Sequence, residues 1–319
     1  MAIADVPSLD LKDFRAAGAN SHYGTRFVEE LGKAYINYGF CRVSGHRVDR
    51  KTKNRLYTAA NGFFDLPLET KMKYRRPGVN RGYKGFKEES AKNWTEGDLK
   101  EFFHIGRELN PAELERLKYP DNVWPDYDLP GFKAIGLHAY SEFEDSGNQF
   151  LEALEIFLGL EKNYFRERTR NGNSVLRLLH YPPIKSDPGN AVRSAPHEDI
   201  NLVTLLTGAD SPGLEILTVS GEWIPINAGH NELVINAGDM LQWFTNGLIR
   251  STTHRVVNPP REKWYEPRIS MPFFMHPDNK TDLTPPEQFV TAERPQRFGK
   301  ITAGEYLDQR LGQNYKTVK

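Results

Sequence analysis

Hydrophobic residues along this chain change their spacing near Gly172. Before that glycine, apolar side chains recur three, four or seven positions apart, which is the period of one face of an α-helix. This spacing predicts a helix over residues 27–38 that ends at Gly39, another over 61–74 that is interrupted near Pro67, and a long amphipathic helix over 129–160. The first third of the chain is therefore expected to contain helices with short strands, among them FCRVSG after Gly39.

After Gly172 the spacing of apolar residues falls to two, and glycine, proline, aspartate or asparagine turns separate the runs. The expected strands are SVLRLLHYPP, NLVTLLTG, GLEILTV, EWIPI, ELVINAGDMLQWFT, STTHRVVNPP and PRISMPFFMHP. Short, closely spaced strands of this kind are typical of a jelly roll. The sequence predicts a mainly β fold with flanking helices in one structural unit. Its expected parts are a helical and strand region over 1–120, a bridging helix over 121–171, the β-core over 172–279 and a C-terminal segment with a helix over 280–319.

Composition and charge narrow the class of protein. Lys and Arg together number 42, as do Asp and Glu, so the 319-residue chain has no net charge. We therefore expect no general attraction to nucleic acid or to an anionic membrane. The N-terminus has no basic segment followed by an apolar one, and no window approaches the roughly 18 apolar residues of a membrane span. The single cysteine, Cys41, lies in an apolar stretch. We expect a cytoplasmic protein that is a monomer or a small homo-oligomer.

The stretch SAPHEDINLVTLLT places two metal-coordinating side chains, His197 and Asp199, one residue apart before a predicted buried strand. A metal held by this pair needs another donor from a neighbouring strand. His230 lies in a turn-like stretch and His276 at the end of a strand, so His254, inside a strand, is the best candidate. Two imidazoles and one carboxylate form the facial triad of non-haem Fe(II) oxygenases, although zinc can use the same donors.

A second pair of polar residues, Arg268 and Ser270, lies two positions apart in EPRISMPFF and hence on one face of a strand. An arginine that faces the inside of a barrel is costly unless it has an anionic partner. Bidentate pairing with a carboxylate suits a site for a dicarboxylic acid, to which Ser270 would add a hydroxyl donor. On this segment alone, an arginine that faces outward at the rim of the barrel is the alternative.

Together these patterns match a known family. The order H-x-D, H-R-V and R-x-S resembles the isopenicillin N synthase-like family of 2-oxoglutarate/Fe(II)-dependent dioxygenases. The supporting stretches are LRLLHYPP, HEDINLVTLL, GEWIPI, INAGDMLQWFTNG, STTHRVVNP and PRISMPFF, with VPSLDLKDF, NYGFCRVSGH, FFDLPLETKMKY and RGYKGFKEES in the N-terminal third. The resemblance covers almost the whole chain and implies a double-stranded β-helix fold.

The resemblance also implies an oxidoreductase that uses Fe(II), 2-oxoglutarate as cosubstrate and O2. Succinate and CO2 would be released while a small organic molecule is oxidised, most often by hydroxylation. The catalytic iron ligands that it implies are His197, Asp199 and His254, and the cosubstrate-binding residues are Arg268, Ser270 and Tyr181.

The sequence departs from the family pattern at two places. Leu179 stands where plant members carry an asparagine that contacts the cosubstrate. Thirteen residues separate His254 from Arg268, which predicts a longer hairpin over the PPREKWYE connection. In addition, the founding synthase of the family uses no 2-oxoglutarate and binds its substrate carboxylate with the R-x-S pair. The pattern therefore supports iron more firmly than it supports the cosubstrate.

Candidates for the substrate pocket are basic, imidazole or aromatic side chains on RGYKGF, on EFFHIG and after R-x-S. They are Arg81, Tyr83, Phe86, Phe103, His104, Phe273 and Phe274. Simple packing explains these residues equally well. Because Phe273 and Phe274 point to opposite faces of a strand, one of them is expected in the core.

Three other kinds of protein remain open on the sequence. A zinc hydrolase could use the His/Asp/His set but would not need the R-x-S pair. A jelly-roll binding module without activity would explain the strands but not the triad. An Fe(II) oxidase or cyclase of the isopenicillin N synthase type, independent of 2-oxoglutarate, is the closest alternative.

Overall fold

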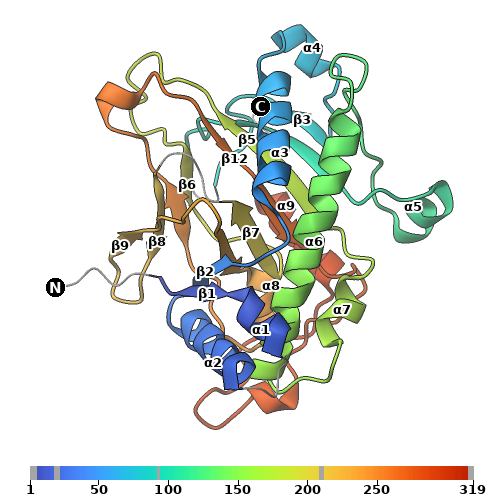
Figure 1. Ribbon diagram of the computed structural model, residues 1–319, viewed down its shortest axis with the longest axis vertical. Helices are drawn as coiled ribbons and strands as arrows, with labels where there is room; N and C mark the ends of the chain where they lie inside the picture. The colour runs from blue at the N-terminus through green and yellow to red at the C-terminus, as the bar shows by residue number, and fades with distance from the viewer. Residues whose placement is uncertain (1–5, 18–21, 92–93, 208–211, 315–319) are drawn as a thin grey trace.

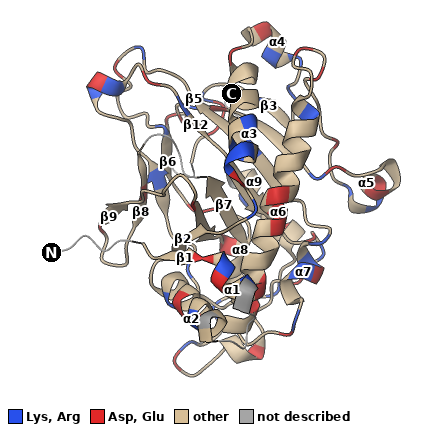
Figure 2. Ribbon diagram, in the orientation of Figure 1, with Lys and Arg blue, Asp and Glu red and all other residues tan. Residues whose placement is uncertain are grey.

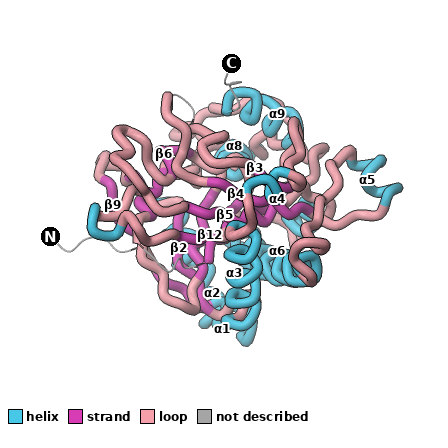
Figure 3. Tube along the Cα trace, turned by 90° about the horizontal axis from the view of Figure 1, so that it is seen from above, coloured by secondary structure: helices cyan, strands magenta, loops and turns pink. Residues whose placement is uncertain are grey.

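Figure 1 shows the computed structural model, which describes residues 6–17, 22–91, 94–207 and 212–314. A large β-sheet forms the centre of the molecule. Helices α2, α3 and α6 cover one face of this sheet, and the smaller sheet with β6 and β9 lies away from these helices (Figure 3). The predicted β-core with flanking helices is confirmed.

The larger sheet contains nine strands among the described residues, in the order β1-β2-β10-β7-β13-β5-β4-β3, with β12 also paired to β5. The β1–β2 pair is parallel and the other pairs are antiparallel. The strands are β1 (Ser8–Asp10), β2 (Phe40–Ser44), β3 (Gly82–Lys84), β4 (Glu101–Gly106), β5 (Val175–Tyr181), β7 (Val203–Thr207), β10 (Leu233–Ala237), β12 (Arg268–Ser270) and β13 (Pro272–Met275).

The smaller sheet has the order β6-β11-β8-β9 and is antiparallel throughout the described strands. Its strands are β6 (Ser194–His197), β8 (Leu214–Leu217), β9 (Trp223–Pro225) and β11 (His254–Val256). The two sheets together contain every strand that the alternating pattern after residue 172 predicts.

The helices predicted over 27–38 and 129–160 are present, and the one predicted over 61–74 corresponds to the end of one helix and the whole of the next. The helices are α1 (Leu11–Ala17), α2 (His22–Asn37), α3 (Arg50–Phe64), α4 (Leu68–Met72), α5 (Pro111–Leu117), α6 (Phe132–Phe157), α7 (Tyr164–Thr169), α8 (Asp239–Phe244) and α9 (Ala303–Asn314), with 3-10 turns η1 (Arg261–Lys263) and η2 (Glu287–Phe289). Gly39 follows α2 with a φ of +67°, a conformation that a helix-ending glycine adopts without strain. The break expected near Pro67 separates α3 from α4.

Three predictions on the second half of the chain were wrong in detail. ELVINAGDMLQWFT is a strand followed by helix α8, because its apolar residues after Gly238 have helical spacing. PRISMPFFMHP forms two strands, since β12 pairs only with β5 whereas β13 pairs with both β5 and β7. The connection from β11 to β12 is no hairpin, because these two strands belong to different sheets.

The long helix α6 lies close against the larger sheet. A Cβ atom at Gly147 would come within 2.5 Å of the Met275 sulfur, so the absence of a side chain lets the helix approach β13. The Phe273 ring packs against α6 next to Gly147. Its centroid lies 5.0 Å from that of Tyr140 and 5.7 Å from that of Phe143. Phe273 is fully buried, so it belongs to the core between sheet and helix.

Basic and acidic residues are both spread over the ribbon (Figure 2), as the balanced composition leads one to expect. Among the residues that the structure describes, no helix combines the length and the apolar character needed to cross a bilayer.

Replacing Phe273 with alanine should lower the free energy of unfolding by about 3–5 kcal/mol, because it leaves a cavity between α6 and the sheet. Phe274→Ala is the matched control, since the neighbouring ring is only partly buried. Urea unfolding of both variants measures the difference. Equal losses would contradict the assignment of Phe273 to the core.

Candidate metal centre and its cavity

Two histidines face each other across the smaller sheet. His197 ends β6 and His254 begins β11, and the antiparallel register makes them direct cross-strand partners. Such partners project to the same face of a sheet. Their ring centroids are 4.4 Å apart. The register between β6 and β11 shifts after His254, so this pair lies next to an irregularity in the ladder.

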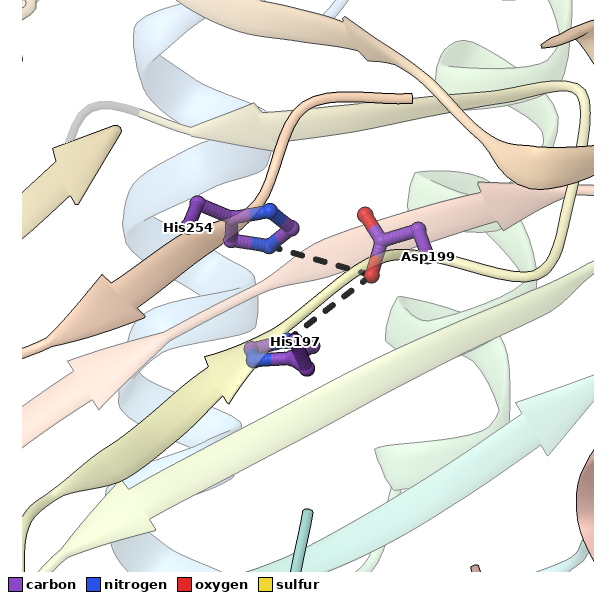
Figure 4. A group of neighbouring side chains, drawn as sticks. All are labelled: His197, Asp199 and His254. Carbon is purple, nitrogen blue, oxygen red and sulfur yellow. Dashed lines mark ion pairs between the residues drawn. The ribbon is translucent and has the colours of Figure 1, made fainter. Parts of the chain in front are cut away.

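Asp199 completes the group two residues after His197. Its Oδ1 atom lies 3.9 Å from Nε2 of His197 and 3.8 Å from Nε2 of His254 (Figure 4). Two metal–ligand bonds of about 2.1 Å can span up to roughly 4.2 Å, so one ion can bridge each pair. Within the described residues, these three side chains form the group of histidines and acids that could hold a metal ion.

The other ring nitrogen of each histidine is fixed by the backbone. Nδ1 of His197 lies 2.8 Å from the carbonyl oxygen of Ala195, and Nδ1 of His254 lies 3.2 Å from that of Thr252. A carbonyl only accepts hydrogen bonds, so Nδ1 must carry the proton in both rings. Each Nε2 then keeps a lone pair directed at the shared space, which is the tautomer that a metal ligand needs.

The carboxylate of Asp199 is held in the same manner. Its Oδ2 atom accepts hydrogen bonds from the Thr204 hydroxyl at 2.6 Å and from the Asn236 amide at 2.9 Å. Asn201 in turn donates to the Thr204 hydroxyl at 2.8 Å, which fixes the direction of that donor. Oδ1 is left to face the two imidazoles.

The protonation states suit a divalent cation. Burial, with the neighbouring His254 charge, lowers the pKa of His197 to about 4. Burial tends to raise the pKa of Asp199, but His254, His197 and the hydrogen bonds from Asn236 and Thr204 together lower it. A neutral imidazole and an ionised carboxylate are the forms that bind metal. The donor set fits Fe(II), though by itself it would also fit zinc.

The structure brings the predicted anion-binding residues together on β12 and β5. Arg268 pairs in register with Tyr181, and Ser270 pairs with Leu179. All three polar residues are buried, with exposures of 3% for Arg268, 4% for Ser270 and 2% for Tyr181. The Arg268 guanidinium carbon lies 5.1 Å from the Tyr181 ring centroid. Leu179, in place of the family's asparagine, packs on Tyr181 and Phe102.

A cavity of about 440 Å³ opens beside the triad. Helix α9 forms part of its wall, and it is held to α8 by a hydrogen bond from Tyr306 to Asp239 and an ion pair between Arg310 and Asp239. Besides His197 and Asp199, the lining includes Asn80, Glu89, Asp98, Lys100, Arg177, Phe274, His276, Leu307, Arg310 and Leu311.

Charged residues in the cavity wall neutralise one another. Arg177 forms two hydrogen bonds with Glu89, at 3.1 and 3.3 Å. Lys100 lies 2.9 Å from Glu89 and 2.7 Å from Asp98. Burial tends to raise the pKa of Glu89, but Arg177 and Lys100 lower it far more. In this part of the wall, two cations thus lie against two anions.

Of the substrate candidates chosen from the sequence, Phe274 lines this cavity and the others do not. Tyr83 donates a hydrogen bond to Glu101, and Phe103 packs against Phe63 and Phe132 in the core. Arg81 is fully buried and donates to Asn80 and Asn173. His104 lies behind Arg177 and accepts a hydrogen bond from its Nε atom. Phe274, not Phe273, faces the cavity, and Phe86 lies in a separate surface pocket.

Sequence reasoning missed residues that the alternation could have found. Arg177 shares a strand face with Tyr181 in LRLLHYPP, and His276 alternates in step with Arg268 and with Phe274, which was already a candidate. His276, which we expected at the edge of the fold, is buried and lines the cavity. Glu89 lies in a loop and Lys100 at the start of a strand. No local sequence pattern reveals that either of them lies near the cavity.

Comparisons with known proteins agree with this geometry. Residues 6–127 match the model for the non-haem dioxygenase in morphine synthesis N-terminal region, and residues 172–277 match the 2OG-Fe(II) oxygenase superfamily. A 2-oxoglutarate-dependent dioxygenase, traH of Penicillium crustosum, is 32% identical over 86% of this chain and 84% of its own length.

Solved structures are similar over almost the whole chain. A 2OG-Fe(II) oxygenase family protein from Caulobacter crescentus has a TM-score of 0.87 and 42% identity, over 97% of this chain and 98% of that one. A full-length Neurospora crassa protein, solved in complex with alpha-KG, has a TM-score of 0.83 and 29% identity, over 96% of each chain. The same Neurospora crassa protein has also been solved with alpha-KG and thymine, with a TM-score of 0.84.

The chain belongs to the 2OG-Fe(II) oxygenase superfamily. It is a 2-oxoglutarate-dependent dioxygenase, an oxidoreductase whose cofactors are Fe(II) and the cosubstrate 2-oxoglutarate. This identity does not favour the zinc hydrolase, the binding module or the oxidase that works without cosubstrate.

Thr204→Val tests the support of the carboxylate by removing the hydroxyl bonded to Oδ2 of Asp199. We expect Fe(II) affinity to fall by about 10–100-fold, the usual cost of losing such an outer partner. Anaerobic competition with a chelator measures this affinity. Thr207→Val is the control, since Thr207 lies on the same strand and is equally buried. Equal losses in the two variants would contradict a specific role for Thr204.

Proposed function

We propose that this dioxygenase hydroxylates a small, neutral, polar molecule, with His197, Asp199 and His254 as the iron ligands. The observation that carries the proposal is the common face formed by two cross-strand histidines and Asp199, next to a cavity. The order of its motifs favours the isopenicillin N synthase-like branch of the superfamily.

Arg268, Ser270 and Tyr181 are proposed to hold 2-oxoglutarate. The support is a buried guanidinium beside a hydroxyl and a tyrosine on adjacent strands. Such an arrangement binds a carboxylate by charge-assisted hydrogen bonds. When bound, iron and cosubstrate together supply the oxidising chemistry. The protein's residues would fix the ligand geometry, bind the distal carboxylate of the cosubstrate in one orientation and exclude water.

The substrate is proposed to occupy the cavity beside His197. Because Arg177 and Lys100 are already neutralised by Glu89 and Asp98, a charged substrate would leave its own charge unbalanced there. The wall offers hydrogen-bonding groups at Asn80, and an aromatic face at Phe274. The thymine found in the Neurospora crassa structure is a molecule of this kind, so small neutral nucleobases form the first set to screen.

We propose a cytoplasmic monomer or small homo-oligomer. The balanced charge of the sequence supports action on free small molecules and not on nucleic acid or membranes. The regions over 1–120, 121–171, 172–279 and 280–319 are proposed to act as one structural unit.

The first test is an anaerobic titration. Adding 2-oxoglutarate to the Fe(II)-loaded protein should produce a saturable visible charge-transfer band. Arg268→Ala should weaken 2-oxoglutarate binding by about 10–100-fold, because it removes a charge-assisted pair worth roughly 1.5–3 kcal/mol. Arg261→Ala, an exposed residue on the preceding connection, is the control. Absence of the band from iron-loaded protein would contradict the proposed cosubstrate site.

Arg177→Met tests the assignment of the cavity to the substrate. We expect substrate-stimulated succinate release to fall by at least about tenfold, while the affinity for 2-oxoglutarate stays the same, because only the cavity wall has changed. The probe is the nucleobase that most stimulates succinate release by the unaltered protein. Arg255→Met, whose partner is Glu215 on the neighbouring strand β8, is the matched control. Unchanged stimulation in Arg177→Met would place the substrate elsewhere.

A further inference from the structure

A second buried arginine lies beside Arg268. Arg193 is 2% exposed and directly precedes β6, the strand whose last residue is His197. Its guanidinium carbon lies 5.9 Å from the Tyr181 ring centroid, and that of Arg268 lies 5.1 Å from the same centroid. The two guanidinium groups therefore gather around one tyrosine ring in the interior of the molecule.

The charge of Arg193 is poorly compensated within the protein. Its Nη2 atom donates a hydrogen bond of 3.0 Å to the backbone carbonyl of Glu266, and its Nε atom is buried without a hydrogen-bond partner. Among the described residues, no carboxylate forms an ion pair with this side chain. Burial and the positive charge of Arg268 lower the pKa of Arg193 to about 10, although it remains protonated at neutral pH.

Two buried cations that repel one another are costly unless an anion accompanies them. One arginine, Arg268, is enough to bind one carboxylate. A hydrogen bond to the Glu266 carbonyl needs only a neutral donor, so this bond does not explain why residue 193 is a charged arginine. Any ligand carboxylate bound at Arg268 lies within the field of Arg193 as well, and Coulomb attraction in a buried site extends over several ångströms. The anion proposed to bind in this pocket is the distal carboxylate of the cosubstrate.

We infer that Arg193 is a second cationic determinant of cosubstrate specificity, which acts with Arg268 on the distal carboxylate of 2-oxoglutarate. The inference rests on the proposed cosubstrate site and adds a residue to it. Arg193 selects a 2-oxo acid that ends in a carboxylate over one that ends in a methyl group. Because it directly precedes the strand that ends at His197, it also connects the carboxylate end of the pocket to the metal end.

The test compares two ligands that chelate iron in the same way. 2-Oxopentanoate has the length of 2-oxoglutarate but carries a methyl group in place of the distal carboxylate. Both are titrated anaerobically into Fe(II)-loaded protein, and dissociation constants are taken from the charge-transfer band. Arg193→Met should weaken 2-oxoglutarate binding by about tenfold and leave 2-oxopentanoate binding unchanged. Arg193→Lys, which keeps the charge, should lose less affinity for 2-oxoglutarate than Arg193→Met.

Coupling between the two arginines gives a second readout. If both act on one carboxylate, the effects of Arg193→Met and Arg268→Ala on 2-oxoglutarate binding will not add in the double variant, whereas independent structural effects will. Should Arg193→Met not fold, Arg193→Gln, which retains a donor for the Glu266 carbonyl, provides the same comparison. Iron affinity and melting temperature are measured for each variant.

The outcomes separate the two proposals. If the unaltered protein gives no band with 2-oxoglutarate, the proposed cosubstrate site itself fails. A second outcome is that the unaltered protein gives a normal band while Arg193→Met binds both ligands equally less tightly, or binds both as tightly as before. Either result overturns only the role of Arg193. Additive effects in the double variant overturn it as well.

Discussion

The pairing of β6 with β11 is the interaction on which the rest of the site depends. It sets His254 opposite His197 and leaves Asp199, just beyond the end of β6, facing both rings. Three donors that converge in this way require the ladder to hold its register, since a slip of one residue would turn each histidine to the other face. The larger sheet supports this arrangement through Thr204 on β7 and Asn236 on β10, which fix the carboxylate.

The two sheets divide the chemistry between them. The smaller sheet carries both histidines, whereas β5 and β12 of the larger sheet carry Tyr181, Arg268 and Ser270. Each imidazole is fixed by a backbone carbonyl two residues before it. The orientation of both histidines is thus built into main-chain hydrogen bonds, which tolerate changes of neighbouring side chains, whereas Asp199 depends on the Thr204 and Asn236 side chains. The cavity wall uses side-chain ion pairs instead, and this is where members of one fold can differ in substrate.

Buried charge has two different forms in this molecule. Around Arg177 and Lys100 the charges are paired within the protein, which makes that wall rigid and close to neutral. Around Arg193 and Arg268 two like charges lie near one tyrosine, and Arg193 forms no ion pair with a carboxylate among the described residues, an arrangement that suits a bound anion. A substrate and a cosubstrate of different charge can therefore be kept apart by electrostatics alone.

The sequence by itself predicted the fold class and the long helix α6, because strand and helix periods are local. The order of H-x-D, H-R-V and R-x-S identified the candidate triad through resemblance to a family. Tertiary structure alone decided the cavity. Which of Phe273 and Phe274 faces it depends on where α6 packs, and the partners of Arg177 come from β4 and from the loop before it. The β11–β12 connection looked like a hairpin because strand pairing between distant segments leaves no local signal. Packing and charge set the contacts between distant segments. No short stretch of the sequence contains both residues of such a contact, so local patterns cannot reveal it.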